Sequence, residues 1–337
     1  YENTYSSPAS FNNKWGVAIA LAKVNRDTKY GIFEVGMNKV NEIGALSELI
    51  NPDISIITNI GDAHIGNLGS RKAIAIEKSD IMMGMSEDSI AILPNDSEYL
   101  DLLRDRNNHR KIKFITFGKS PESDIQILPI TKDKNYSILN FLIGGKTYKS
   151  KSKKSNSSIF ENYMPILAVG NILGIAPNDI LKRLEESEGP DGRWQDLDFG
   201  YNGGVIKLIN DTYNASPESM THAIKSVSEY RSNNVLRKIA IIGDMLELGK
   251  FTDEYHSRLV QVINDSEIDK VYFCGDILSS YFESINKDKQ AHLFKSCNLI
   301  DIKEYFDIKN GDLFFFKGGN QIGLNKLVQD FINYLRL

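Results

Sequence analysis

Residues able to bind a metal ion or a phosphate gather around one predicted strand-to-helix turn. An apolar run over residues 54–58 is typical of a buried strand, and the Gly-rich turn after it carries Asn59 and His64. The helix predicted over residues 70–85 places Lys78 at or near its packed face. Because open parallel sheets bind ligands at the carboxyl ends of their strands, this turn is predicted to be a functional site. A histidine that merely caps the turn is the alternative.

A carboxylate near the end of another predicted strand, over residues 30–35, adds to this prediction. Glu34 lies in an otherwise apolar stretch, where a charged residue is rare unless it is paired or bound to metal, and a structural ion pair is the alternative. A glutamate and a histidine at neighbouring strand ends suit a loosely held Mg²⁺ that keeps water molecules and binds substrate phosphates. Lys78 near them would neutralise phosphate or, if carbamylated, act as a carboxylate.

Other classes of function are poorly supported. No G-x-G-x-x-G follows a predicted strand, which argues against a dinucleotide-binding dehydrogenase, and no C-x-x-C or H-E-x-x-H is present, so tightly bound zinc is not expected. The net charge of −4 gives no general attraction to nucleic acid or to an anionic membrane, so small-molecule partners are expected. No apolar run approaches the ~20 residues needed to cross a bilayer. Cys274 and Cys297 lie on different segments and are expected to be reduced, which predicts a cytoplasmic protein.

Strand and helix patterns alternate along the 337 residues, which predicts an α/β fold with about two domains. Short strands over residues 125–130, 136–143 and 147–151 are interpreted as an antiparallel patch on a mostly parallel first sheet. The turn-rich segment 189–193 is the predicted domain boundary, and a second, mostly parallel sheet is expected after it. Helices are predicted over residues 41–50, 159–171, 178–186, 217–230, 253–264 and 324–335, and further strands over residues 90–93, 114–117, 194–199, 205–209, 239–242, 271–274 and 313–316.

Five segments of the chain, in order, resemble the Mur ligases. They are YGIFEVGMNKVNEI, ITNIGDAHIGNLGS with EKSDI after it, LINDTYNASPESM, AIIGDMLELGKFTDEYH and FFFKGGNQIGLNKLV. The likeness covers nearly the whole chain, and D-x-Y-N-A with G-D-M-x-E-L-G is specific to the branch that adds D-Ala-D-Ala. The resemblance implies an incomplete central ATPase-type domain over residues 1–192 and a Rossmann-like C-terminal α/β domain over residues 193–337.

The activity that this resemblance implies is ATP-dependent amide formation in peptidoglycan synthesis, in the cytoplasm and with Mg²⁺. ATP would phosphorylate the carboxylate of a UDP-N-acetylmuramoyl tripeptide. The amine of D-Ala-D-Ala would then attack the acyl phosphate to give an amide, ADP and phosphate. No nucleic-acid or membrane partner is implied, and a monomer is expected.

The resemblance also carries roles over to residues that match the family's motifs. Glu34 and His64 resemble Mg²⁺ ligands, and Lys78 resembles the lysine whose carbamate helps to place a second metal; these three are the predicted catalytic residues. Arg193 resembles the arginine that approaches ATP from the domain boundary, and Asp211 the carboxylate that holds the ribose. The remaining predicted contacts are Asn59 and Asn162 for ATP and Asn38, Tyr213, Asn214, Lys317 and Asn320 for the substrates. A purely structural role is the alternative for the last four.

Some family features are not found. The family's phosphate loop of the G-K-T type precedes the segment that aligns with residues 5–16, after a domain that grips UDP, and neither is found before that segment here. We therefore expect a piece of a longer ligase that turns over little or no ATP alone. The G-x-H-N segment that touches adenine aligns with residues 156–159, where His is replaced. A sister ligase, such as a folylpolyglutamate synthetase or another Mur step, and a non-catalytic nucleotide- or peptide-binding remnant are the alternatives.

Overall fold

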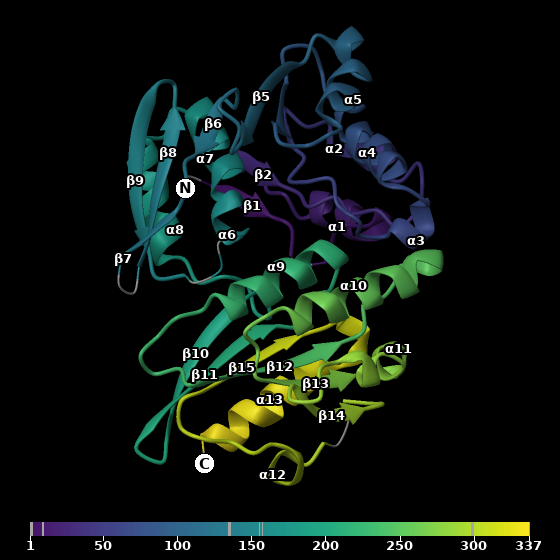
Figure 1. Cartoon of the computed structure of the whole chain (residues 1–337). Coiled ribbons are helices and arrows are strands. Elements are labelled where there is room, and N and C mark those ends of the chain that lie inside the picture. The colour runs from purple at the N-terminus through teal and green to yellow at the C-terminus, as the bar shows by residue number, and fades with distance from the viewer. Residues whose placement is uncertain are drawn as a thin grey trace. The chain divides into compact units, whose positions relative to one another are not determined.

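The chain divides into two compact units in the computed structural model (Figure 1). The structure describes residues 3–8, 10–133, 136–154, 156, 158–297 and 300–336. The first unit comprises Tyr1–Lys132, Ser137–Ser152 and Ile159–Glu185, and the second comprises Asp133–Tyr136, Lys153–Ser158 and Glu186–Leu337. The domain boundary between residues 192 and 193 stays a prediction.

A mixed sheet forms the centre of the first unit. Its parallel part consists of β3 (Ile54–Ile56), β4 (Ile90–Pro94), β5 (Lys113–Gly118) and β6 (Ile125–Ile127), and β7 (Thr131–Asp133), β8 (Tyr136–Ile143) and β9 (Lys146–Ser152) extend it. The β6–β8 and β8–β9 pairs are antiparallel, which confirms the predicted patch. Gly144 and Gly145 both have positive φ, as a two-residue hairpin turn requires. A separate parallel pair joins β1 (Thr4–Ser6), which was not predicted, to β2 (Tyr30–Ile32).

The helices of the first unit lie between its strands and after them along the chain. They are α1 (Lys14–Ala22), α2 (Ile43–Ile50), α3 (Ile65–Leu68), α4 (Arg71–Ser79), α5 (Leu100–Asp105), α6 (Ser158–Glu161), α7 (Tyr163–Ile172) and α8 (Pro177–Glu186). The helix predicted over residues 70–85 ends earlier, because α4 stops at Ser79 and continues only as a 3-10 turn, Asp80–Met82. Buried Phe141, Phe160 and Leu167 belong to the cluster that packs α6 and α7 onto the sheet.

The second unit is built on a six-stranded sheet in the order β10-β11-β15-β12-β13-β14. The strands are β10 (Gln195–Tyr201), β11 (Gly204–Asp211), β12 (Arg237–Gly243), β13 (Lys270–Cys274), β14 (Gln290–Phe294) and β15 (Asp312–Lys317). The β10–β11 pair is antiparallel and the other pairs are parallel, which confirms a mostly parallel second sheet. Strand β14 was not predicted, because it is a half-buried edge strand and its sequence lacks a continuous apolar run.

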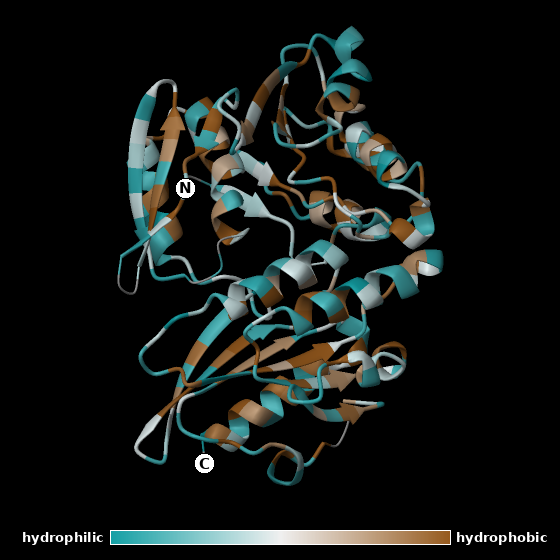
Figure 2. Cartoon of the chain, in the orientation of Figure 1, coloured by the Kyte–Doolittle hydropathy of each residue, from teal (hydrophilic) through white to brown (hydrophobic). Residues whose placement is uncertain are grey.

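Helices and a hydrophobic core position the strand ends of this unit. The helices are α9 (Pro217–Ser228), α10 (Thr252–Asn264), α11 (Asp276–Ser279), α12 (Ile302–Tyr305) and α13 (Leu324–Leu335). Figure 2 shows hydrophobic residues concentrated on the central strands of the sheet. Phe314 and Phe316 of β15 pack against Phe331 of α13, with ring centroids 4.7 and 5.4 Å apart. The carboxyl ends of β11 and β15 are thereby held by a rigid core.

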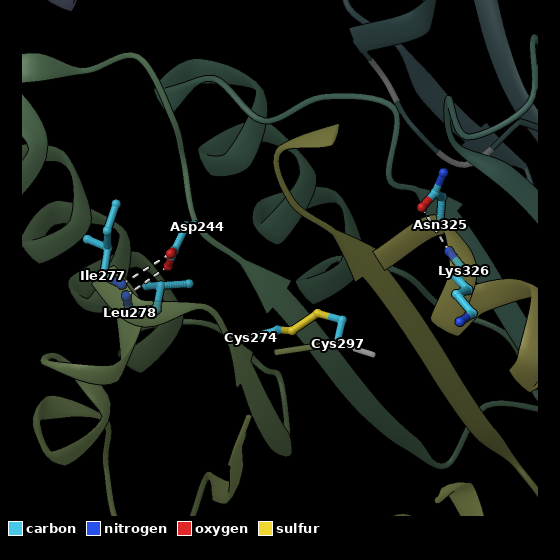
Figure 3. The surroundings of a disulfide bond; sticks show 7 residues. All are labelled: Asp244, Cys274, Ile277, Leu278, Cys297, Asn325 and Lys326. Atoms are coloured by element: carbon cyan, nitrogen blue, oxygen red, sulfur yellow. Dashed lines mark hydrogen bonds between the residues drawn. A yellow bond between two sulfur atoms is a disulfide. The ribbon is translucent and has the colours of Figure 1, made fainter. Parts of the chain in front are cut away.

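The two cysteines are joined by a disulfide, so the expectation that both are reduced is wrong (Figure 3). Cys274 ends β13, and Cys297 follows the neighbouring strand β14, with Cα atoms 6.1 Å apart. Disulfides are rare in cytosolic proteins, so the cysteines no longer support the predicted localisation. Among the described residues, no helix combines the length and apolar character needed to span a membrane.

Candidate functional site

Lys78 binds the turn that the sequence singled out. Its Nζ donates a hydrogen bond to the backbone carbonyl of Asn59, with 2.7 Å between the two atoms. Helix α4, which carries Lys78, is started by Ser70, whose side chain accepts the N–H of Ala73. Lys78 is half-buried, whereas Asn59 is exposed. The structure therefore brings together these two predicted site residues.

His64 occupies the N-cap position of the short helix α3, with φ 62°. Its side chain makes no capping hydrogen bond to this helix, and the choice between a metal ligand and a turn-capping histidine stays a prediction. The turn is held instead by Arg71, whose guanidinium donates two hydrogen bonds, of 2.5 and 2.6 Å, to the carboxylate of Asp62. Asp62 is buried. A bidentate pair fixes both distance and orientation, so this pair sets the path of the chain around His64.

Glu77, next to Lys78, is a site-shaping residue that sequence reasoning missed. Its buried carboxylate accepts the backbone N–H groups of Asn41, Glu42 and Ile43 over 2.7 to 2.9 Å, and it thereby holds the start of α2. These N–H groups have no partner within the helix, and a carboxylate is favourable at this end of the helix dipole. The signal was present, since Glu77 directly follows the small and apolar run from Ala73 to Ile76.

Glu34 lies just after β2 and is exposed. Its Oε1 accepts a hydrogen bond of 2.8 Å from the side-chain amide of Asn12, and its backbone N–H donates to the hydroxyl of Ser7. Asn12 is a neutral partner, so this contact orients the carboxylate without the ion pair considered from the sequence. The backbone N–H of Asn38 donates to Glu42 over 2.6 Å. Within the described ranges, no group of three or more His, Cys, Asp or Glu residues could hold a metal ion.

Two predicted site residues of the second unit, Asp211 and Lys317, contact each other directly. They are register partners at the carboxyl ends of β11 and β15, and their side chains form an ion pair of 2.7 Å. Lys317 is buried, and its Nζ also donates to the backbone carbonyl of Asn214 over 2.9 Å. Burial lowers the pKa of Lys317, and the carboxylate of Asp211 opposes that shift. The other oxygen of Asp211 accepts the backbone N–H of Trp194 over 3.1 Å.

Arg193 stacks on Tyr213, with the guanidinium carbon 3.9 Å from the ring centroid. The backbone N–H of Tyr213 donates to the carbonyl of Gly192 over 3.0 Å. Gly192 has φ 69°, a conformation that favours glycine, and a Cβ there would also make a tight contact of 3.2 Å with the backbone nitrogen of Tyr213. The turn before β10 is thereby tied to the end of β11.

A pocket of about 310 Å³ opens beside these residues, within the second unit. Of the predicted site residues, Tyr213 and Asn320 line it. The full lining consists of Asp191, Gly192, Asn210, Thr212, Tyr213, Asn320, Asn325, Lys326 and Gln329. Three of these residues, Asn325, Lys326 and Gln329, lie on α13 and were missed by sequence reasoning, because only the tertiary fold brings this helix to the end of β11.

Two family models match the chain and together cover most of it. The model described as the Mur ligase middle domain matches residues 2–170, and the one described as Mur ligase, glutamate ligase domain, matches residues 192–319. The chain belongs to the Mur ligase family. The resemblance inferred from the motifs is thus confirmed.

Among similar proteins, the UDP-N-acetylmuramoyl-tripeptide--D-alanyl-D-alanine ligase of Bacillus subtilis is 30% identical over 97% of this chain, which spans 70% of that relative. A crystal structure of MurF from Acinetobacter baumannii matches 98% of this chain and 71% of its own, with a TM-score of 0.84 and 23% identity. MurF from Thermotoga maritima, solved in complex with ADP, matches 99% of this chain and 74% of its own, with a TM-score of 0.83 and 22% identity. Because both structures are less than 25% identical to this chain, they are evidence for its fold and not for its activity.

Two further segments of this Mur ligase differ from the expected pattern. A Gly-Lys-Thr triplet does occur, at residues 145–147, but it lies in the hairpin between β8 and β9 and not on a strand-to-helix turn. In the segment expected near adenine, Asn156 accepts hydrogen bonds from the backbone N–H and the hydroxyl of Ser158, and Ser157 lies outside the described residues. Asn162, also predicted to contact ATP, is exposed at the N-cap position of α7.

The G-D-M-x-E-L-G motif serves as a brace in this Mur ligase. The buried carboxylate of Asp244 accepts the backbone N–H groups of Ile277 and Leu278 at the start of α11 (Figure 3). The backbone carbonyl of Asp244 accepts the N–H of Gly319 over 3.0 Å. One residue thus fixes the turn after β15, directly beyond Lys317.

Proposed function

We propose that this chain is an ATP-dependent ligase that adds D-Ala-D-Ala to a UDP-N-acetylmuramoyl tripeptide in peptidoglycan synthesis. The observation that carries this proposal is the similarity, along nearly the whole chain, to the B. subtilis ligase whose name gives both substrates. The T. maritima structure is of a complex with ADP, which supports an adenine nucleotide as the second ligand. Ion pairs and polar turns at strand ends in each unit are consistent with binding charged ligands.

The proposed reaction passes through an acyl phosphate, which requires two anions, a carboxylate and a terminal phosphate, to approach each other. ATP and Mg²⁺, when bound, would supply the phosphoryl group and the positive charge that stabilises this approach. Glu34 and His64 would hold the metal. The described residues contain no group of three or more His, Cys, Asp or Glu residues that could hold a metal ion, so water and phosphate oxygens would have to supply the remaining ligands. Asn12 would keep the carboxylate of Glu34 in one orientation.

Lys78 is the proposed site of carbamylation. Its neutral amine would attack carbon dioxide, form one N–C bond and release one proton. The carbamate nitrogen keeps one hydrogen, so the hydrogen bond to the carbonyl of Asn59 is retained while two new oxygens become available to a metal. Neighbouring Glu77 holds the start of α2 by accepting three backbone N–H groups. We therefore assign the carbamate role to Lys78 and a positioning role to Glu77.

In the second unit, the proposed nucleotide contacts are Asp211 and Arg193. Each carboxylate oxygen of Asp211 already accepts one hydrogen bond, and a carboxylate has about four acceptor sites, so two remain for the hydroxyl groups of a ribose. Arg193 is exposed and uses one face of its guanidinium on Tyr213, which leaves its in-plane N–H groups for phosphate. Lys317 would hold Asp211 and the backbone of Asn214 in place.

A ligation assay tests the proposed function. ATP, Mg²⁺, D-Ala-D-Ala and a UDP-N-acetylmuramoyl tripeptide are supplied, and the peptide product is identified by mass spectrometry. In the complete enzyme, Lys78→Ala should abolish ligation, and short-chain carboxylates should partly restore it, because they replace the carbamate. Full activity of Lys78→Ala would reduce Lys78 to a packing role, and product formation only with a different amine would favour a sister ligase.

Binding of ADP with Mg²⁺ to the 337-residue chain gives a readout besides turnover. Asp211→Asn should weaken this binding, whereas Asp330→Asn, an exposed change on the outer side of α13, should not. That the chain alone turns over little or no ATP stays a prediction, which D-Ala-D-Ala-dependent phosphate release at a stoichiometric rate would contradict.

A further inference from the structure

A second pocket, of about 750 Å³, opens in the second unit at the amino ends of β12 and β13, and we call it the amino-end pocket. Asp211 and Lys317 end β11 and β15, and β12 runs parallel to β15, so these two residues lie at the opposite edge of the sheet. The seven residues of β12 separate the two edges by about 20 Å. The amino-end pocket is therefore distinct from the proposed nucleotide contacts, and its volume falls within the range of about 300–1,000 Å³ that is common for ligand pockets.

The lining of the amino-end pocket carries more cations than carboxylates. It comes from three segments that lead into β12, β13 and β14, and its basic residues are Arg231, Arg237, Lys238, Lys270 and Lys289. Arg237 is neutralised outside the lining, by ion pairs with Asp307 and Asp312. The other four cations face three carboxylates within the lining, so the pocket keeps a net positive charge, which favours a ligand with negative charge.

Two of these lysines are buried and bind the carboxyl ends of helices. Lys238 is 8% exposed, and its Nζ donates to the carbonyl of Ser228, the last residue of α9. Lys289 is 9% exposed, and its Nζ donates to the carbonyls of Ile263 and Ser266 at the end of α10. The partial negative charge of a helix carboxyl end favours this placement, so both ammonium groups are held in fixed positions. An ammonium has three N–H donors, which is more than these carbonyls use, so each lysine can also bind an anion.

Glu267 marks the position where an anion would be held. Its Oε1 accepts a hydrogen bond from Nη2 of Arg231 over 2.9 Å, and its Oε2 lies 3.3 Å from Nζ of Lys238. Both cations also donate to the carbonyl of Ser228, which brings them together. The side chains of Glu267 and Arg231 are each 61% exposed, and exposed ion pairs are weak. The carboxylate therefore bridges two converging cations without being firmly fixed, and a ligand with two negative charges would displace it.

An apolar rim belongs to the same lining as these cations. It consists of Tyr230, Val235 and Leu236. Leu236 is 79% exposed, although a leucine side chain gains stability by leaving water. A bare inorganic phosphate would fill little of the volume of about 750 Å³ and would leave this rim in water. A ligand that fits the lining therefore carries an apolar group as well as negative charge.

We propose that the amino-end pocket binds a small organic phosphate. Its phosphate replaces the carboxylate of Glu267 between Arg231 and Lys238, and its apolar group covers Leu236. A phosphate monoester suits the two cations, because it carries close to two negative charges at neutral pH and three acceptor oxygens. This inference goes beyond the proposed function, since it assigns to the second unit a further ligand site at the edge of the sheet opposite the nucleotide contacts.

Calorimetric titration of the 337-residue chain with phenyl phosphate and with inorganic phosphate tests both parts of this ligand. Phenyl phosphate should bind about tenfold more tightly, because its ring buries apolar surface. Arg231→Gln should weaken binding of phenyl phosphate about three- to fivefold, and Glu267→Gln should strengthen it by about the same factor, because the competing carboxylate is removed. Leu236→Ser should weaken binding of phenyl phosphate about threefold and leave that of inorganic phosphate unchanged. All three residues are exposed, so the variants should fold.

Two matched variants control for general effects of surface charge. Glu254 and Arg258 form an exposed ion pair of 2.8 Å on α10, outside the lining, so Glu254→Gln and Arg258→Gln should leave binding of phenyl phosphate unchanged. Weaker binding to Glu267→Gln would show that this carboxylate positions the cations instead of competing for them, and would overturn the proposal. The absence of saturable binding to the folded wild-type chain would also overturn it. Binding that none of the three pocket variants changes would do the same, because the phosphate would then lie elsewhere, such as at the proposed nucleotide contacts.

Discussion

Replacing Lys317 by methionine tests whether the ion pair at the carboxyl ends of β11 and β15 holds the second unit together. The side chains of Lys317 and Asp211 are 3% and 17% exposed. Removing one partner of a buried pair typically costs about 3–5 kcal/mol, because the other charge is left uncompensated. Asp211 keeps the N–H of Trp194 and some contact with solvent, so we expect the lower end, about 3 kcal/mol, for Lys317→Met.

A double-mutant cycle separates the interaction energy between Lys317 and Asp211 from the cost of leaving either charge buried alone. Asp211→Asn should also be strongly destabilising, because it leaves the buried ammonium of Lys317 with neutral oxygens only. The double variant should be more stable than the sum of the single changes predicts, by about 2 kcal/mol, since neither charge is then left alone. An interaction energy below about 0.5 kcal/mol would refute the view that the two side chains form one charged unit.

Tryptophan fluorescence during urea unfolding is a suitable assay for this cycle. The sequence has two tryptophans, and only Trp194 is buried, at 6% exposed, whereas Trp15 is 75% exposed. Trp194 contacts Asp211 directly, so its emission reports on the second unit. The chain has two compact units, and total helix content would combine the unfolding of both. The fluorescence of Trp194 follows the second unit alone, so a two-state analysis can be applied to its transition.

Three other predictions concern residues outside that pair. Burial lowers the pKa of His256 below its ordinary 6.5, and the hydrogen bond between Nδ1 and the carbonyl of Thr252 opposes that shift, as do the carboxylates of Asp244 and Asp253. Nε2 accepts the N–H of Met245, which only a neutral imidazole can do. As the pH falls, His256 is therefore protonated in the unfolded chain before it is protonated in the folded one. The stability that neutral His256 contributes is fully present above about pH 6.5 and is lost as the pH falls through the folded pKa. Acid-unfolding curves should show a smaller loss for His256→Gln. Reduction of the disulfide, whose cysteines are 23 residues apart, should destabilise the second unit by about 3 kcal/mol, and free thiols in the native protein would contradict this bond. Glu77→Ala should speed amide exchange at residues 41–43 far more than Glu77→Gln does, since glutamine retains an acceptor; equal effects would argue against the cap.

How far the sequence predicts this structure differs between local and long-range features. The helix over residues 324–335 was predicted with its observed bounds, because a strong apolar stripe follows Gly323. The antiparallel patch over residues 125–151 was likewise predicted from local turn chemistry, and its hairpin turn lies at Gly144-Gly145. Pairing of Cys274 with Cys297 was missed, since it depends on which strands are neighbours in the sheet.

Long-range polar contacts account for the other misses at the candidate site. Lys78 was placed correctly near the packed face of its helix, but the more deeply buried charge is its neighbour Glu77, whose partners lie more than 30 positions earlier. The Arg71–Asp62 pair was missed as well, because a bidentate contact requires the geometry of the turn between them. Periodicity identifies which face of a helix is buried, and it cannot identify the partner that compensates a charge on that face.

The position of Asp244 separates what a motif identifies from what it does. Its branch-specific sequence led to a prediction about substrates, yet both its carboxylate oxygens are engaged with the start of α11 and its carbonyl with Gly319. The same turn also packs tightly against the end of β12: a Cβ on Gly318 would lie 2.9 Å from the Cα of Gly243, which leaves no room for a side chain. These contacts fix the chain between Lys317 and Asn320, which carry an ion pair and a wall of the pocket. Asp244 thus acts on any bound ligand through the strand ends that it positions.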